Sequence, residues 1–254
     1  MDAPADLPSL ADIRHEIDAI DDGLLDLVAR RLASVEQVRR VKARTGDITQ
    51  SPIRPAREAF ILRRLIKKSE GRVPADLCVR LWRALISAAT LQQAPVGIHI
   101  TAELLGDAGA RMLISDHFGP ANLTAHYDVA TAFSAIAKNP GDIAIVSVTA
   151  RWPEPFLKKR AGDARVICCL PFLAEAVTPR LLVFGHAPPE PTGNDETLVI
   201  SKEPAQTKSL WQAEIGDHFV TSLPGFLSGS DPLLAGVSGL IIAGCYPHPL
   251  EARR

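Results

Sequence analysis

The sequence lacks the features of a membrane-spanning, secreted or metal-binding protein. It contains no run of about 20 apolar residues, the length that a membrane-spanning helix needs. Its N-terminus, MDAPADLPSL, has no basic region followed by an apolar stretch, so we expect no signal peptide. Its four cysteines show no CxxC or Cys/His ligand spacing, which indicates reduced thiols rather than disulfides or a zinc site. These absences predict a cytoplasmic protein without a metal centre.

An excess of charge of one sign is also missing, because 28 Lys and Arg residues balance 29 Asp and Glu residues. Such a chain has no overall field to hold nucleic acid or an anionic membrane, so we expect neither as a partner. Aromatic residues make up only 5%, but 46% hydrophobic and 22% charged residues suffice for a folded core. The length of 254 residues favours two domains.

Glycine and proline are scarce only in the first part of the chain. Residues 1–95 contain 3 of the 17 glycines and 6 of the 20 prolines, and their net charge is +3. Residues 96–254 contain the remainder and have a net charge of -4. We therefore predict a helical domain over residues 1–95 and a turn-rich α/β domain over residues 96–254.

Three helices are expected in the first part. The longest begins after Ser9, a suitable N-cap, and ends near Gly46. Its apolar residues alternate three and four positions apart, at Leu10, Ile13, Ile17, Ile20, Leu24 and Leu27. A helix of roughly 35 residues is about 50 Å long, so no small monomeric domain can cover it and a partner chain is implied. The other two helices are expected over Pro55–Gly71 and Pro74–Gln93.

Short apolar runs separated by turn residues follow Pro95. They predict a helix over Asp128–Lys138 and a set of strands. The expected strands are Val96–Ile100, Ile143–Val148, Val166–Leu170, Leu181–Phe184, Leu198–Ile200 and Leu240–Ala243. Cys168 and Cys169 would then point to opposite faces of one strand, and His99 would be a packed strand residue rather than a metal ligand.

A cation interrupts the apolar seam of the first helix. Arg31 falls on the heptad position of Ile17 and Leu24, where a large apolar residue is expected. The guanidinium of Arg31 could reach water by extension of its side chain. Arg31 is not an isolated cation, however, because Arg14 and Lys42 lie beside the seam of the same helix. Arg31 and Lys42 are about 16 Å apart along the axis, a span that a ligand with several polar groups can bridge. Arg14 is about 25 Å from Arg31 and would have to come from a second protomer.

These three cations predict a site for a small dicarboxylate. Buried cations of like sign are costly unless an anion completes them, and a guanidinium fits a carboxylate. Glu58 and Gln93 are further polar residues able to reach such a site. For Arg57 and Glu58, the alternative is an ordinary solvent-facing first turn of the second helix.

Three stretches carry a family resemblance: LADIRHEIDAIDDGLLDLVARRLASVEQVRRVK, IRPAREAFILRRL and LWRALISAATLQQ. They resemble the all-helical chorismate mutases, which are intertwined dimers of three-helix protomers, and they cover residues 10–93. The resemblance implies a homodimer that converts chorismate to prephenate in aromatic amino acid biosynthesis. It also implies that no cofactor is needed, because the reaction is a rearrangement within one molecule.

The resemblance also implies a role for each candidate residue. Arg14 from one protomer and Arg31 from the other would hold the two carboxylates of chorismate. Lys42 and Gln93 would donate hydrogen bonds to the ether oxygen of the breaking bond.

The remaining contact of the site comes from the second helix. Glu58, with the backbone near Arg57 as a further substrate-binding element, would hold the ring hydroxyl. One position departs from the family pattern, because Ala89 replaces a serine, which removes one carboxylate contact. Arg54 stands where many members have an aspartate, although an arginine is also familiar there in members with an RPxRE motif.

Two other functions are compatible with these residues. An isochorismate-pyruvate lyase has a similar Arg14, Arg31 and Lys42 pattern, but lacks the stretch around Arg57 and Glu58. A non-catalytic module that senses chorismate or an aromatic amino acid is the second alternative.

The second part of the chain weakly resembles prephenate dehydratase. The segment TPRLLVFGHAPPEPTGNDETLVIS corresponds to the region around a Thr-Arg-Phe motif, but here the triplet is Pro179-Arg180-Leu181, with Thr178 one residue out of register. The interval before it is too short for two complete lobes. We therefore expect a truncated, periplasmic-binding-like α/β domain of regulatory or unknown role, without dehydratase activity.

Overall fold

The computed structural model describes residues 8–45, 52–174, 180–234 and 239–251. The chain forms two compact units, Met1–Ile48 and Thr49–Arg254. The second unit therefore combines two helices of the N-terminal part with the whole α/β part. This division by packing does not test the sequence-based boundary at residue 95, which stays a prediction.

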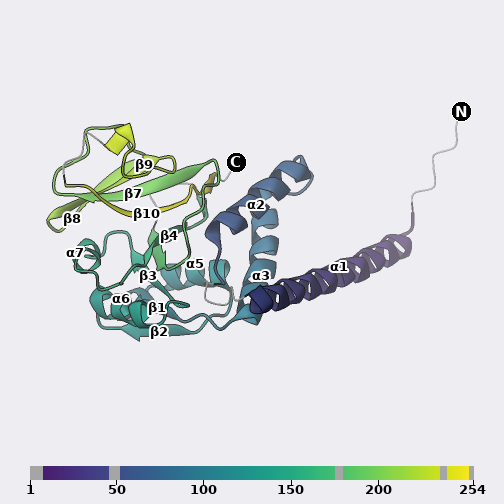
Figure 1. Cartoon of the computed structure of the whole chain (residues 1–254). Coiled ribbons are helices and arrows are strands. Elements are labelled where there is room, and N and C mark those ends of the chain that lie inside the picture. Colours follow the sequence, from purple (N-terminus) through teal and green to yellow (C-terminus); the bar gives the residue numbers. More distant parts are fainter. Residues whose placement is uncertain (1–7, 46–51, 175–179, 235–238, 252–254) are drawn as a thin grey trace, which may run out of the picture. The chain divides into compact units, whose positions relative to one another are not determined.

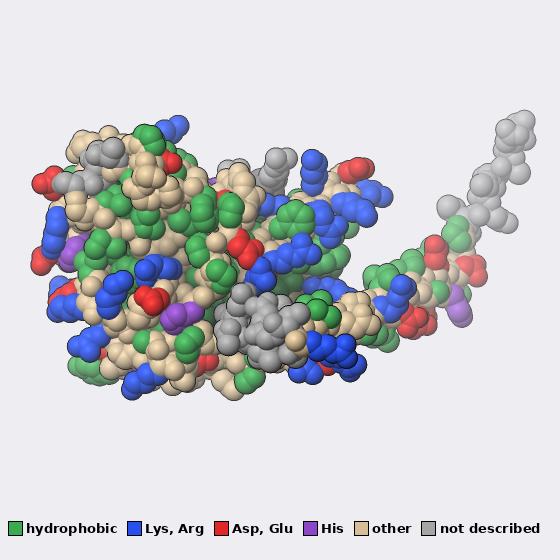
Figure 2. All heavy atoms as spheres, in the orientation of Figure 1, with side chains coloured by type: hydrophobic (Ala, Val, Ile, Leu, Met, Phe, Trp, Pro, Cys, Tyr) green, Lys and Arg blue, Asp and Glu red, His purple; other side chains and the backbone are tan. Residues whose placement is uncertain are grey.

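The first unit consists, in its described part, of one long helix. Helix α1 spans Leu10–Thr45 (Figure 1). Ser9 is its N-cap, since the Asp12 backbone N–H donates to Ser9 Oγ and the Ser9 N–H donates to Asp12 Oδ2. Gly46, the expected end, lies outside the described residues. Figure 2 shows hydrophobic side chains among the charged ones along this helix. The exposed large apolar residues of α1 are Leu10, Ile13, Ile17, Ile20, Leu24, Leu25, Leu27, Val38 and Val41.

The two other expected helices are confirmed. Helix α2 spans Pro55–Ser69, with proline in its first turn, and α3 spans Ala75–Gln93. Helix α2 ends two residues earlier than expected, because Glu70 already adopts a left-handed backbone with φ of 51°. The two helices pack on each other and on the α/β part of their unit.

A nine-stranded mixed sheet forms the centre of the second unit. Its strand order is β2-β1-β3-β6-β4-β10-β7-β9-β8, with β2, β1 and β3 parallel to one another. The strands are β1 (Ile98–Thr101), β2 (Leu123–His126), β3 (Ile143–Ser147), β4 (Arg165–Leu170), β6 (Leu181–Gly185), β7 (Asp195–Ser201), β8 (Trp211–Ile215), β9 (His218–Pro224) and β10 (Ile241–Pro247). Two shorter strands, β5 (Leu173–Ala174) and β11 (Leu250–Glu251), pair separately.

Helices cover both faces of the parallel part of this sheet. They are α4 (Ala102–Gly106), α5 (Ala108–Phe118), α6 (Val129–Lys138) and α7 (Pro153–Leu157). In β3, Ile143 and Ile145 pack with α4 and α5, whereas Ala144 and Val146 pack with α6 and α7. Such a strand is apolar on both faces because each face is covered.

All six expected strands and the expected helix are present with shifted ends. Cys168 and Cys169 belong to the two opposite apolar clusters, as predicted. His99 is also a packed strand residue, hydrogen-bonded to His126 and Asp142. Helices in the first 93 residues followed by a mixed α/β region confirm the predicted fold class at this level.

The buried His117 in α5 predicts a loss of stability in acid. Burial, and next the charge of Arg83, hold the pKa of His117 well below 6.5. Below pH 6.5 the unfolded chain therefore binds a proton that the folded chain excludes, and the free energy of unfolding falls by up to about 1.4 kcal/mol per pH unit. Urea unfolding of His117→Gln should show a flatter profile between pH 7.5 and 5 than the wild type. His15→Gln, an exposed control, should keep the wild-type slope, and an equally steep His117→Gln profile would contradict this assignment.

Candidate functional site

Glu58 is buried and paired with an arginine that sequence analysis did not single out. It lies in the first turn of α2, while Arg83 lies on α3, and Arg83 Nη1 donates to Glu58 Oε2. Both side chains are almost completely buried. Arg83 also lies over the ring of Phe172, with 4.9 Å between guanidinium carbon and ring centroid. The expected alternative of a solvent-facing Glu58 is therefore wrong.

Arg57 and Gln93 have different surroundings from Glu58. Arg57 is exposed on α2 and its guanidinium lies over the ring of Phe60 at 5.3 Å, so the solvent-facing alternative holds for this residue. Gln93 is half-buried at the end of α3, where its Nε2 donates to the carbonyl of Ala89 at 3.2 Å.

The three cations of the predicted site lie on α1, in the first compact unit. Arg14 is exposed, whereas Arg31 is half-buried and its pKa is lowered by that burial. Lys42 belongs to α1, but its side chain lies outside the described residues. Each unit thus carries one part of the predicted site, and the assembly of these parts is a proposal.

Arg83 has a sequence signal that could have revealed it. Val79, Arg83, Ile86 and Ser87 share the buried face of α3. A cation at a helix position where apolar residues are expected is the same misfit that singled out Arg31. On α3 the misfit marks an ion-pair partner for Glu58.

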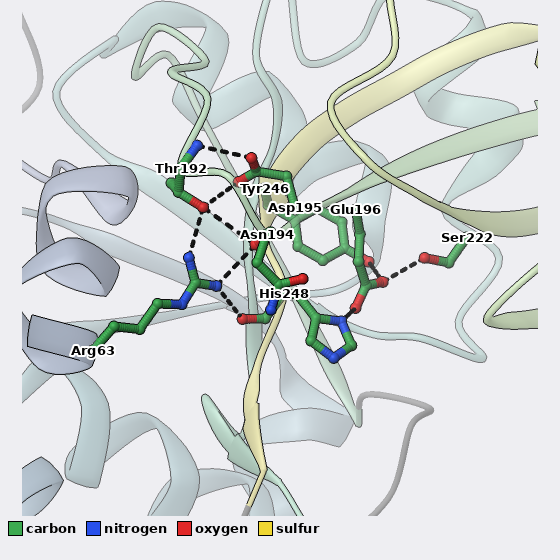
Figure 3. Close-up of polar contacts among 8 residues, drawn as sticks. All are labelled: Arg63, Thr192, Asn194, Asp195, Glu196, Ser222, Tyr246 and His248. Atoms are coloured by element: carbon green, nitrogen blue, oxygen red, sulfur yellow. Dashed lines mark hydrogen bonds and ion pairs between the residues drawn. The ribbon is translucent and has the colours of Figure 1, made fainter. Parts of the chain in front are cut away.

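A second arginine, Arg63 on α2, forms hydrogen bonds to residues at one end of the sheet (Figure 3). Arg63 donates to Thr192 Oγ1 at 2.7 Å and to the carbonyls of Asn194 and His248, each at 2.8 Å. Burial lowers the pKa of this guanidinium, while Asp195 acts in the opposite direction. Nearer the start of the same helix, Arg54 forms an ion pair with Glu190.

The end of the sheet that accepts hydrogen bonds from Arg63 also contains a buried carboxylate, that of Glu196. Glu196 on β7 is fully buried and hydrogen-bonded to Ser222, to the Tyr246 hydroxyl at 2.9 Å and to His248 Nδ1 at 2.8 Å (Figure 3). These contacts join β7, β9, β10 and the residue that follows β10. The helix that carries Glu58 therefore docks on a rigid hydrogen-bonded frame.

The α/β region contains a cavity of about 730 Å³ at the carboxyl ends of its parallel strands. Thr101 and Ser147 line it at the ends of β1 and β3. Its charged lining residues comprise four cations and four carboxylates: Arg151, Lys158, Arg160, Arg180, Glu103, Asp107, Asp128 and Glu154. Open α/β sheets bind ligands at such an edge. Of the Pro179-Arg180-Leu181 triplet, the structure describes Arg180 and Leu181, and both line this cavity. Thr178 and Pro179 lie outside the described ranges.

Within the described ranges, no cluster of three or more His, Cys, Asp or Glu side chains could hold a metal ion. In the same residues, no helix is both long and apolar enough to cross a membrane.

Residues 13–94 match the family model of chorismate mutase type II. The bifunctional chorismate mutase/prephenate dehydratase of Pseudomonas aeruginosa is 30% identical over 96 residues, covering 37% of this chain and 26% of that protein. The protein of the same name from Stutzerimonas stutzeri is 27% identical over 88 residues, covering 34% and 24%. The chain thus spans about a quarter of the length of the curated relatives that it matches.

Two solved structures show a weaker likeness. One is titled "GqqA- a novel type of quorum quenching acylases", at 12% identity and a TM-score of 0.42, covering 59% of this chain and 94% of the other. Prephenate dehydratase from Streptococcus mutans is 13% identical with a TM-score of 0.36, covering 62% and 100%. Neither likeness defines the second region further. The family match covers the helices that carry all six predicted site residues, and residues 13–94 are thus similar to the type II chorismate mutases.

Proposed function

We propose that the protein is a chorismate mutase, an isomerase that rearranges chorismate to prephenate in the cytoplasm for aromatic amino acid synthesis. The observation that carries this proposal is the family match over residues 13–94, which includes every position of the predicted site. The buried state of Glu58 supports it, because a carboxyl group held in a buried position is suited to orient a small polar substrate.

The residues act by binding and electrostatics alone. Arg14 and Arg31 hold the two carboxylates of chorismate, which brings the reacting ends of the molecule together. Lys42 and Gln93 donate to the ether oxygen, where negative charge develops as the bond breaks. Glu58 accepts a hydrogen bond from the ring hydroxyl, and Arg57 contributes through the neighbouring backbone. The reaction needs no nucleophile, general base or cofactor.

The active form in this proposal is a homodimer in which Arg14 crosses to the partner's site. Arg14 and Arg31 are 17 positions apart on one helix, about 25 Å, so two side chains of one α1 cannot hold one small molecule. The exposed apolar seam of α1 supports the dimer, because an isolated helix with such a face is unstable in water.

The direct test is an absorbance assay of chorismate consumption by the purified protein, with prephenate and pyruvate both quantified. Prephenate supports the mutase. Pyruvate formed from isochorismate would indicate the lyase instead, and absence of turnover with either substrate would favour the sensing module.

The large cavity favours a second, regulatory function for the α/β region. It has the size of a small-molecule site and both signs of charge, which suits a zwitterionic ligand such as an amino acid. We expect phenylalanine or tyrosine to bind there in calorimetric titrations, and Arg180→Ala to weaken binding about tenfold by removing one charged hydrogen bond. Lys138→Ala, on the end of α6 and absent from the cavity lining, is the matched control. A flat titration with both amino acids would exclude regulation by these two ligands.

A further inference from the structure

Glu58 can serve as a specific hydroxyl acceptor only if its carboxyl group is held in one orientation. In the structure Arg83 does this, because its Nη1 donates to Glu58 Oε2 and both groups are almost fully buried. An unpaired carboxylate at such a position would be strongly disfavoured. The hydrogen bond from Arg83 uses one oxygen, and a carboxylate has a second oxygen available as an acceptor.

The space beside this pair fits a small polar group. Glu58 and Arg83 line a cavity of about 20 Å³, whose other lining residues are mostly apolar and include the polar Ser87, Thr90 and His117. A volume of this size accommodates about one water molecule or hydroxyl group. Arg83 Nε is buried there without a hydrogen-bond partner among the described residues. The pair therefore borders a pocket for one hydroxyl rather than for a whole ligand.

The position of Arg83 depends on the α/β region. Its guanidinium lies 4.9 Å from the ring centroid of Phe172, which follows β4. A cation over an aromatic face is attracted by the negative charge density of the ring, and more strongly in a buried site than at the surface. On the other side, Ser87 of α3 donates to the carbonyl of His117 at 2.8 Å and fixes α3 against α5.

We propose that Arg83 is a positioning residue of the mutase site, which orients Glu58 toward the ring hydroxyl of chorismate and is itself held by Phe172 of the α/β region. This inference rests on the proposed mutase function and extends it, because it makes the second region part of the substrate-binding apparatus. In this proposal, Arg83 acts through Glu58 and does not contact the substrate.

The test compares kcat and KM of wild type, Arg83→Gln, Arg83→Lys, Glu58→Gln and the double variant Glu58→Gln/Arg83→Gln. We expect Arg83→Gln to raise KM about tenfold or more with a smaller effect on kcat, since a misdirected acceptor loses a charged hydrogen bond to bound substrate. Arg83→Lys should recover part of the loss. The double variant should equal Glu58→Gln, because Arg83 acts through Glu58. Arg80→Gln, on the exposed side of α3, is the matched control and should behave as wild type.

The outcomes separate this inference from the proposed function. An active wild type with an unchanged KM in Arg83→Gln would overturn the inference alone, as would losses that multiply in the double variant. A more active Arg83→Gln would also overturn it, because the ion pair would then block Glu58. An inactive wild type would overturn both proposals. If Arg83→Gln fails to fold, Phe172→Leu tests the same inference, because it removes the ring over which Arg83 lies. We expect Phe172→Leu to raise KM, and an unchanged KM would contradict the inference.

Discussion

Replacing Lys42 by alanine should lower kcat about 10²- to 10³-fold while the protein stays folded. In the proposed mechanism, Lys42 donates to the ether oxygen, whose negative charge develops only as the bond breaks. In other enzymes, removal of one such hydrogen-bond donor lowers kcat about 10²- to 10³-fold. The decrease is in kcat because the donor interacts more strongly with the transition state than with the bound substrate. Steady-state kinetics with chorismate, together with circular dichroism and thermal unfolding, measures both parts of this expectation.

The matched control for Lys42→Ala is Arg40→Ala on the same helix. Arg40 is exposed and its Nε donates to Glu36 at 3.1 Å, so its loss should leave kcat within about twofold, as for other surface substitutions. Mixing Arg14→Ala with Lys42→Ala protomers extends the test to the shared site. A heterodimer contains one pocket with both residues intact and should recover part of the activity. Equal kcat in Lys42→Ala and wild type would refute the role of Lys42, and absence of recovery in the mixture would refute sharing of Arg14.

The sequence was sufficient for elements that a local pattern specifies. The three-and-four spacing of α1, the N-cap Ser9 and the proline in the first turn of α2 each act within one helix, so they could be recognised without knowledge of the fold. The central strands β3, β4 and β6 are continuous apolar runs, and their burial on both faces follows from that composition.

Elements with weaker patterns were missed for physical reasons. Strand β2, Leu123–His126, lies at the sheet edge and its middle residues are exposed, so it has no apolar run. Strand β8, Trp211–Ile215, is the other edge and is buried only at its two ends. Helices α4 and α7 contain five residues each, too few to show a helical period.

The candidate site likewise contains some residues that a local sequence pattern reveals and some contacts that it does not. Arg31 and Glu58 were found because one breaks a helical seam and the other lies in a family motif. Arg83 pairs with Glu58 across 25 positions, and Arg63 reaches His248 across 185 positions. Contacts of this kind depend on tertiary packing, which no local spacing encodes. The ion pair therefore became visible only in the folded chain.

Placing a charge on the apolar seam of α1 should abolish both the dimer and the activity. Ile17 and Leu24 lie two turns apart on this seam, and Leu24 is 55% exposed in the single chain. Ile17 and Leu24 are about half exposed, so burial of each in a dimer contributes about half of the 1.5–3 kcal/mol of full burial, and a symmetric dimer buries both twice, about 3–6 kcal/mol in total. The double variant Ile17→Asp/Leu24→Asp should raise the dimer dissociation constant by at least about two powers of ten. Light scattering coupled to size-exclusion chromatography should then report a monomer.

The loss of activity in that monomer distinguishes a shared site from a self-contained one. If Arg14 must come from the partner, no monomer can hold both carboxylates of chorismate, so turnover should disappear together with the dimer. Ala19→Asp adds the same charge to an exposed position of α1 away from the seam and should leave both properties intact. A monomeric but fully active double variant would place the complete site within one chain. A dimeric double variant would move the interface away from the α1 seam, and the exposed apolar side chains would then require another partner surface.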